Sequence, residues 1–414
     1  MNRRDTVILR ELGKQIAEAA ALDINAKTIA MWQRLNALKP LRPMIMIDQL
    51  PWHELNDTGE LTLHCADDFL KNIECDLRRR LYKFRHFRGD MVMPNCVEIP
   101  KLVHTRPVLI ATGRTLATDS ANSVVAHEFT DVIPDEAALD RIPMPVVAVD
   151  AAGDRKRLEI AAGIFDGILA ARLVGPAWDY SMYGGVWDQI TTLRGVEKVL
   201  YDLIDRPEFS HRIIAKFVKM ASSVVDQYEA LGLFDADTPL VHCTGAYSDE
   251  LPSKQYDGKN AKAGDVWIFG LAQVFSTVSP AMHEEFEIEP MKPLLEQFGL
   301  VYYGCCDPLD RKIDIVRKIR NVRKISMSPW ADAERGAAQM AGDFVFSAKP
   351  NPAFVAMDRF DEALVRKELK HIVATCRKYK TPCELIFKDI STVRYQPQRL
   401  VVWEQIAKEV ANEA

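Results

Sequence analysis

The stretch LVYYGCCD, residues 300–307, sets the pattern from which the fold can be predicted. A short apolar run leads through a glycine into two adjacent cysteines and an aspartate. A second stretch of this kind, TPLVHC at 238–243, ends on a histidine beside a cysteine. Continuous apolar runs of this length, bounded by turn residues, are typical of strands buried on both faces of a parallel sheet. Both stretches are therefore predicted to be buried strands that end in soft ligand atoms.

Six further apolar runs bounded by turn residues bring the number of predicted strands to eight. Amphipathic stretches of helical period lie between most of them, which indicates a parallel sheet covered by helices. Eight alternating units predict an α/β fold of the (β/α)₈ TIM barrel type. The eight runs are PMIMID (43–48), GILAARLVG (167–175), TPLVHC (238–243), DVWIFG (265–270), LVYYGC (300–305), RKISMS (323–328), DFVFSA (343–348) and CELIFK (383–388).

The alternation of strands and helices is interrupted after the first strand, because residues 49–166 are far more than one crossover helix needs. This insertion is predicted to contain a helix over 71–87, followed by a β hairpin or small sheet. Residues 1–40 are predicted to be an N-terminal helical extension with two helical stretches. The barrel with its insertion then occupies residues 41–414.

The composition limits the class of protein. Hydrophobic residues make up 48% and charged residues 27%, which is ordinary for a globular enzyme. The net charge of −5 lacks the basic excess expected of a nucleic-acid-binding protein. No apolar stretch reaches the ~18 residues that would span a membrane, and the charged start reads as a helix, so a cytoplasmic protein is expected. Eight cysteines without the spacing of a disulfide scaffold suit a reducing compartment.

Candidate site residues lie where the apolar runs stop, because the active site of a barrel forms at the carboxyl ends of its strands. Asp48, Lys349 and Asp389 are candidate catalytic groups for positioning substrate or relaying a proton. The aromatic residues among the candidates are predicted either to form the wall of a pocket for a flat substrate or to belong to the core. The basic run at 78–80 is predicted to be a solvated helix face or a contact for an anionic cofactor tail. Candidate substrate contacts are Trp178, Tyr180, Gln273, Trp330 and Asn351.

Thiolates and a neutral imidazole are ligands that zinc prefers, and a site with an open fourth position is catalytic. The candidate ligands are His242, Cys243, Cys305 and Cys306, with Glu98 as an oxygen ligand. Adjacent residues on a strand face opposite sides, so both members of a pair can bind one ion only where the strand has ended. The alternative is that the cysteines are small buried hydrophobic residues.

The stretch at 269–299, the motif YYGCCDPLDRKIDIVRKI and the later FSAKPNP (346–352) resemble the uroporphyrinogen decarboxylase superfamily. The resemblance covers about residues 160–400. The decarboxylases of that superfamily carry an arginine-rich RQAGRY motif, where this chain reads RPMIMIDQLPWHEL (42–55). The resemblance therefore implies the other branch, the zinc-dependent, corrinoid-linked methyltransferases of O-demethylase, methanol and methylamine systems.

That branch binds zinc through a His-x-Cys motif and a later Cys. Here Tyr303 and Gly304 stand where its histidine would lie, and FSAKPNP supplies no later cysteine. The resemblance implies a zinc-dependent methyltransferase that moves a methyl group between a small O-methyl substrate and the cobalt of a separate corrinoid (cobalamin) protein. A homodimer is compatible with the sequence. The alternatives are a decarboxylase or lyase acting on a small acid, and a non-catalytic corrinoid-binding barrel.

Overall fold

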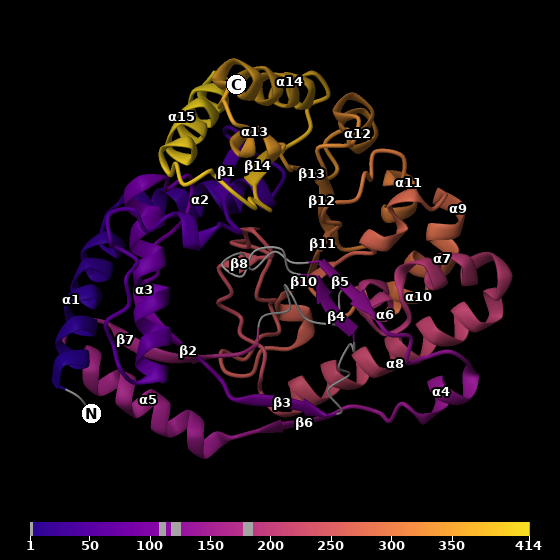
Figure 1. Cartoon of the computed structure of the whole chain (residues 1–414), viewed down its shortest axis with the longest axis horizontal. Coiled ribbons are helices and arrows are strands. Elements are labelled where there is room, and N and C mark those ends of the chain that lie inside the picture. Colours follow the sequence, from indigo (N-terminus) through magenta and orange to yellow (C-terminus); the bar gives the residue numbers. More distant parts are fainter. Residues whose placement is uncertain (1–2, 107–112, 117–125, 177–184, 414) are drawn as a thin grey trace.

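Figure 1 shows the computed structural model, which describes residues 3–106, 113–116, 126–176 and 185–413. The chain alternates helices and strands, as an α/β protein does. None of the helices within these ranges is both long and apolar enough to cross a bilayer. The helices are α1 (Arg3–Ala20), α2 (Ile24–Asn36), α3 (Asp68–His86), α4 (Glu136–Arg141), α5 (Ala151–Phe165), α6 (Val186–Arg194), α7 (Val196–Asp205), α8 (Pro207–Ala230), α9 (Pro280–His283), α10 (Glu289–Leu295), α11 (Ile313–Val316), α12 (Ala333–Met340), α13 (Ala353–Ala356), α14 (Glu362–Lys378) and α15 (Gln398–Asn412).

The centre of the molecule is a curled parallel sheet of six strands in the order β1-β14-β13-β12-β11-β10. Its inner strands are fully buried, because helices or other chain segments cover both faces. The strands are β1 (Met44–Ile47), β2 (Cys96–Pro100), β3 (Val103–Arg106), β4 (Gly113–Leu116), β5 (Ala126–Phe129), β6 (Val146–Val149), β7 (Ala170–Val174), β8 (Leu240–Val241), β9 (Thr244–Gly245), β10 (Trp267–Gly270), β11 (Leu300–Tyr303), β12 (Val322–Met327), β13 (Val345–Ala348) and β14 (Cys383–Phe387).

The two faces of the sheet differ in chemistry. Side chains of the outer face, such as Ile325 and Leu385, join the large core that the helices α8, α10, α12, α14 and α15 complete. On the opposite, inner face lie Lys324, Ser347 and Glu384, all fully buried. Successive residues of a strand point to opposite faces, so one strand supplies both surfaces. The inner face therefore carries buried charged and hydroxyl side chains among apolar ones such as Val345 and Ile386.

Each of the eight predicted strands is present in the structure. Six of them form the continuous sheet. The other two lie outside it: β7 pairs in parallel with β2, and β8 forms a two-stranded antiparallel hairpin with β9. The α/β class is confirmed, whereas closure into a complete eight-stranded barrel stays a prediction.

The two N-terminal helical stretches and the helix predicted over 71–87 are present as α1, α2 and α3. The insertion contains more than the predicted hairpin or small sheet, because it also includes β6 and the helix α5. Its strand β2 pairs with β7 in the register of Glu98 with Arg172, so part of the insertion extends the strand arrangement. The division into residues 1–40 and 41–414 stays a prediction.

Gly245, on the β8–β9 hairpin, has no room for a side chain. A Cβ there would lie 2.4 Å from Cδ2 of Trp32, a fully buried residue of α2. Gly245→Ala is therefore expected to lower the free energy of unfolding by about 1–3 kcal/mol, as overpacking does. Gly163→Ala is the matched control, since nothing lies within 4 Å of that helical position, and it should stabilise by roughly 0.5–1 kcal/mol. Urea denaturation of both variants measures the difference, and equal stabilities would contradict this packing.

Candidate active site

The two cysteines of the 300–307 stretch point into one cluster. Strand β11 ends at Tyr303, and Gly304 turns the chain with a φ of 89°, which favours glycine. Beyond this turn the alternation of a strand no longer applies, and the Sγ atoms of Cys305 and Cys306 lie 3.5 Å apart. Cys305 is buried, whereas Cys306 is partly exposed. The turn is held by Asp307, whose Oδ1 accepts a hydrogen bond of 2.9 Å from the Cys305 backbone N–H.

The adjacent residues His242 and Cys243, by contrast, lie in two different environments. His242 has a φ of 50° between β8 and β9, and its ring stacks on Phe269 with centroids 4.1 Å apart. Its Nε2 lies 3.6 Å from the Sγ of Cys305. Cys243 packs instead in the apolar cluster that contains Trp32. Of this pair, only His242 is in contact with the thiols.

Lys388 and Asp389, which follow β14, complete the cluster. The Lys388 Nζ donates to the Cys305 Sγ at 3.1 Å and to the Asp389 Oδ2 at 2.7 Å. The Cys306 Sγ lies 3.0 Å from the same carboxylate oxygen and 3.5 Å from the Cys305 Sγ, so its single proton can be donated to only one of them at a time. Lys388 is buried and Asp389 is exposed, so the cluster runs from the interior to solvent at the carboxyl ends of β11 and β14. We call His242, Cys305, Cys306, Lys388 and Asp389 the thiol cluster.

The contacts within the thiol cluster shift the pKa values of the two cysteines in opposite directions. The hydrogen bond from Cys306 lowers the pKa of Cys305 well below its usual value, burial opposes this, and His242 and Lys388 lower it further. The pKa of Cys306 is raised, first by its bond to the Cys305 thiolate and then by burial. Burial lowers the pKa of His242, although contact with Cys305 opposes this. Cys305 is therefore the thiolate and Cys306 the protonated thiol.

A thiolate at Cys305 makes a pH-dependent prediction. Because the folded pKa is depressed, the thiolate persists at neutral pH and is lost only as the pH falls well below neutral. The ultraviolet thiolate absorbance of the metal-stripped protein should therefore be present at neutral pH and should be absent in Cys305→Ser. Cys306→Ala should move the titration upward, because it removes the largest stabilising contact. A wild-type titration at the ordinary thiol pKa would contradict the assignment.

The donor atoms of the thiol cluster are of the type that zinc prefers. In a tetrahedral zinc site two sulfur ligands lie roughly 3.8 Å apart and a nitrogen and a sulfur roughly 3.6 Å apart; here the distances are 3.5 and 3.6 Å. Across the described ranges, however, no group of three or more His, Cys, Asp or Glu side chains is arranged to hold a metal ion. The Lys388 ammonium lies against the Cys305 sulfur. Two of the three donor pairs are spaced as zinc ligands are, and the Lys388 ammonium is the group that a metal would have to displace.

A buried ion pair supports the hairpin that presents His242. The Lys324 Nζ donates to Glu384 Oε2 and to Thr244 Oγ1, each at 2.8 Å, and to the Gly245 carbonyl at 3.1 Å. These bonds join β12 and β14 to the β8–β9 hairpin across the inner face. The position of His242 therefore depends on the Lys324–Glu384 pair.

The predicted catalytic residues occupy different surroundings. Lys349 is buried on the inner face, where its Nζ donates to Tyr302 Oη and, at 2.7 Å, to Ser347 Oγ. Burial lowers the pKa of Lys349 to about 8. Asp389 belongs to the thiol cluster. Asp48 follows β1 and has the Lys83 ammonium 3.6 Å away.

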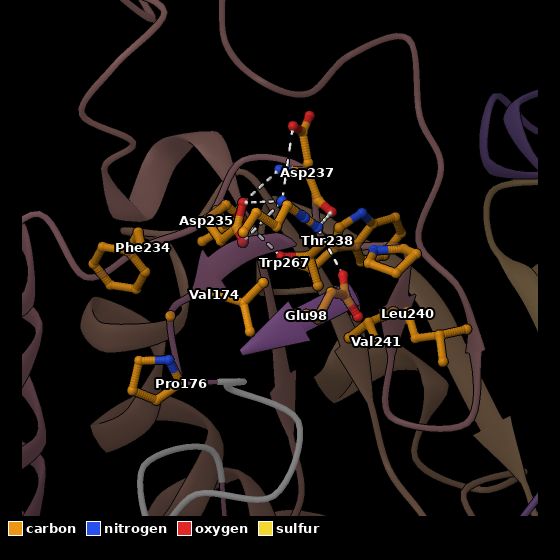
Figure 2. A pocket seen from close by; sticks show the side chains of 14 residues that line it. Glu98, Val174, Pro176, Phe234, Asp235, Asp237, Thr238, Leu240, Val241 and Trp267 are labelled. Carbon is orange, nitrogen blue, oxygen red and sulfur yellow. Dashed lines mark hydrogen bonds and ion pairs between the residues drawn. The ribbon is translucent and has the colours of Figure 1, made fainter. Parts of the chain in front are cut away.

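Glu98, a predicted metal ligand, forms ion pairs with two arginines. Its carboxylate accepts from Arg80 at 2.9 Å and from Arg172 at 2.7 Å, and these charges hold its pKa low although burial opposes them. Figure 2 shows Glu98 with Asp235 and Asp237 in a pocket of about 180 Å³, whose lining does not include the thiol cluster. The structure thus places Glu98 apart from the thiols.

Three of the five predicted substrate contacts, Gln273, Trp330 and Asn351, lie within the described residues. Asn351 donates its backbone N–H to Glu368, and its side-chain oxygen accepts from the backbone N–H of Ala353. Gln273 donates its backbone N–H to Asp188. The Trp330 side chain is 75% exposed. Trp178 and Tyr180 lie outside the described residues.

Lys388, the cation of the thiol cluster, was not among the predicted site residues, although it ends the predicted strand CELIFK (383–388). The signal was its spacing: 384, 386 and 388 share the inner face of one strand. Asp188 was also missed, and burial raises the pKa of its carboxyl to about 7. No sequence periodicity indicates that helix α6 would bring this group near Asp307 and Cys305.

No family model and no curated protein sequence matches the chain. Among solved structures, a methyltransferase from Methanosarcina mazei is similar to it, with 9% sequence identity and a TM-score of 0.49. The similarity covers 92% of this chain and 98% of that one. A match at this identity says nothing about the chemistry of the site. The resemblance to the uroporphyrinogen decarboxylase superfamily stays a prediction.

Proposed function

We propose that this chain is a methyltransferase whose reaction centre is the thiol cluster. The observation that carries the proposal is the buried Cys305 sulfur in contact with an imidazole, a second cysteine and an ammonium at the carboxyl ends of the sheet strands. Soft sulfur donors beside an open, solvent-facing edge suit the capture and polarisation of a methyl donor. The resemblance of the 269–352 region supports the same class.

Under this proposal His242, Cys305 and Cys306 hold a zinc ion, which as a Lewis acid would make a substrate oxygen a better leaving group. The separations of 3.6 and 3.5 Å between these donors support the assignment. Cys243 and Glu98 are not needed as ligands, because each has other contacts.

The chain's own residues handle the proton. Breaking the bond between a methyl group and an ether oxygen leaves an alkoxide, which must gain one proton to become the alcohol. Lys349 suits this role, because burial lowers the pKa of its ammonium to about 8, near the working pH of a general acid. Lys388 is expected to stay protonated throughout the reaction. Burial lowers its pKa, but its contacts with the thiols and Asp389 outweigh burial and raise that pKa.

The proposed methyl acceptor is the cobalt of a corrinoid carried by a separate protein in the cytoplasm, and the proposed donor is a small O-methyl compound. The exposed edge formed by Asp389 and Cys306 is where such a partner would approach. A homodimer is compatible with this arrangement.

A second candidate is a metal-free decarboxylase or lyase that acts on a small acid. The observation that favours it is the pair of buried ammonium groups at neighbouring strand ends, Lys349 and Lys388, which would attract a carboxylate. In this case the thiolate serves as an electrostatic partner of Lys388.

An assay of the purified full chain distinguishes the two functions. Methyl ethers and simple carboxylic acids are incubated with the zinc-supplied protein and free cob(I)alamin, and methylcobalamin formation and carbon dioxide release are both followed. Zinc-dependent methylcobalamin formation from an ether supports the methyltransferase. Carbon dioxide release without methyl transfer, unaffected by a chelator, would replace it with the second candidate.

A further inference from the structure

A cavity of about 270 Å³ lies between the carboxyl ends of β12 and β13 and the helices α12 and α14. Figure 1 shows the two helices beside these strands, on the outer side of the sheet. The volume is near the lower end of the range for ligand sites. Met327, Phe346 and Ile372 give the cavity an apolar wall, and no residue of the thiol cluster lines it. The cavity is therefore separate from the proposed reaction centre.

Two residues that line this cavity each bury a polar atom without a hydrogen-bond partner among the described residues. The atoms are Ser328 Oγ and Glu368 Oε2. Ser328 directly follows β12 and is 4% exposed. Buried polar atoms nearly always have a partner, because an unpaired one keeps its full desolvation penalty. Both atoms are therefore available to a ligand in the cavity.

The Glu368 carboxylate, on α14, is held in place at one oxygen only. Its Oε1 accepts a hydrogen bond of 3.0 Å from the Asn351 backbone N–H. Burial raises the pKa of Glu368 to about 7, and the hydrogen bond from Asn351 opposes this rise. Among the described residues, no Lys, Arg or His side chain forms an ion pair with the carboxylate. A cation at Oε2 is the partner that would stabilise its charge.

The other charged groups of the lining do not supply this cation. Asp332 lies 3.3 Å from Arg335, and Arg335 also pairs with Asp310, so two carboxylates share one guanidinium. The Lys349 Nζ donates to Ser347 Oγ at 2.7 Å on the inner face of the sheet, whereas α14 covers the outer face. The side of the cavity formed by α12 and α14 therefore has an excess of negative charge.

The lining also indicates what kind of cation fits. A Ca²⁺ or Mg²⁺ ion needs about six oxygen ligands, and the side chains here offer too few. A primary ammonium instead donates three hydrogen bonds and can carry a hydrocarbon part. The apolar wall would cover that part. Asp332 and His371 are exposed, so the cavity is open to solvent at these two residues.

We propose that this cavity binds a small alkylammonium ion. Its N–H groups donate to Glu368 Oε2 and Ser328 Oγ, and its hydrocarbon part packs against the apolar wall of Met327, Phe346 and Ile372. The site goes beyond the proposed methyl transfer and does not depend on it, because none of its contacts belongs to the thiol cluster.

Isothermal titration calorimetry of the full chain with butylammonium and with its neutral analogue 1-butanol tests the site. The titrations are run one unit above the pKa of Glu368, where most of this carboxyl is ionised. Butylammonium should bind roughly tenfold or more tightly than 1-butanol, because only the ammonium forms charge-assisted hydrogen bonds.

Two variants locate the contact. Glu368→Gln should remove the preference for butylammonium while leaving 1-butanol binding unchanged. Glu362→Gln is the matched control, because Glu362 is an exposed carboxylate on the same helix outside the lining, and it should bind like the wild type.

Equal binding of the two compounds to the wild type, or no binding of either, would overturn the site. An unchanged preference in Glu368→Gln would overturn it as well. The wild-type comparison needs no variant, so it tests the site even if Glu368→Gln failed to fold. Because the readout is binding and not turnover, failure of the methyl transfer assay leaves this site in place, and the reverse also holds.

Discussion

Lys324→Met is expected to lower the free energy of unfolding by about 3–5 kcal/mol, the largest stability effect we predict. Lys324 and Glu384 are fully buried, and removing the ammonium leaves an uncompensated carboxylate inside the sheet. One oxygen of Glu384 already lacks a hydrogen-bond partner within the described residues, so the remaining charge would have few contacts. Chemical denaturation with urea measures the loss.

The double variant Lys324→Met, Glu384→Gln is the control for this prediction. It removes both charges, so it should recover a large part of the lost stability, because the penalty comes from the unpaired charge. If the single and double variants were equally destabilised, packing at Lys324 and not its charge would be responsible. The single variant should also lose activity beyond its loss of folded protein, because the same ammonium holds Thr244 and Gly245 beside His242.

Cys305→Ser is expected to lower the rate of methyl transfer by at least about 100-fold. Groups that only orient a metal ligand cost about 10- to 100-fold when removed, and a direct donor should cost no less. Serine is harder and is not ionised at neutral pH, so it replaces neither the sulfur donor nor the negative charge. The methylcobalamin assay measures the rate.

Cys75→Ser is the matched control, since Cys75 is a half-buried free thiol on α3. It should retain wild-type transfer. A Cys305→Ser enzyme as active as this control would exclude the thiol cluster as the reaction centre.

The strands could be predicted from the sequence because burial on both faces leaves short apolar runs bounded by turns. The run LVYYGC became β11 and CELIFK became β14 within a residue or two. Barrel closure is a different matter, because hydrogen bonding between β7, β8 and their neighbours depends on tertiary contacts that no local pattern specifies. Lys324 and Glu384 are charged residues within two predicted strands, and no local pattern indicates that they are partners across the inner face.

Part of the site could also be predicted. Both thiols of the Cys305–Cys306 pair face one cluster because the strand ends before them, and this outcome depended on the turn at Gly304. The division between His242 and Cys243 needed three-dimensional information, because the left-handed backbone at His242 directs the ring toward Phe269. The same is true of Lys388, whose ammonium reaches the sulfur atoms from another strand.

The zinc content of the purified full chain tests the central claim most directly, and the adjacent residues His242 and Cys243 supply matched variants. We predict about one equivalent of zinc in the wild type and in Cys243→Ala, and a near-complete loss in His242→Ala and in Cys305→Ser. Loss of zinc in Cys243→Ala with retention in His242→Ala, or a fully active wild type that binds no metal, would contradict the account.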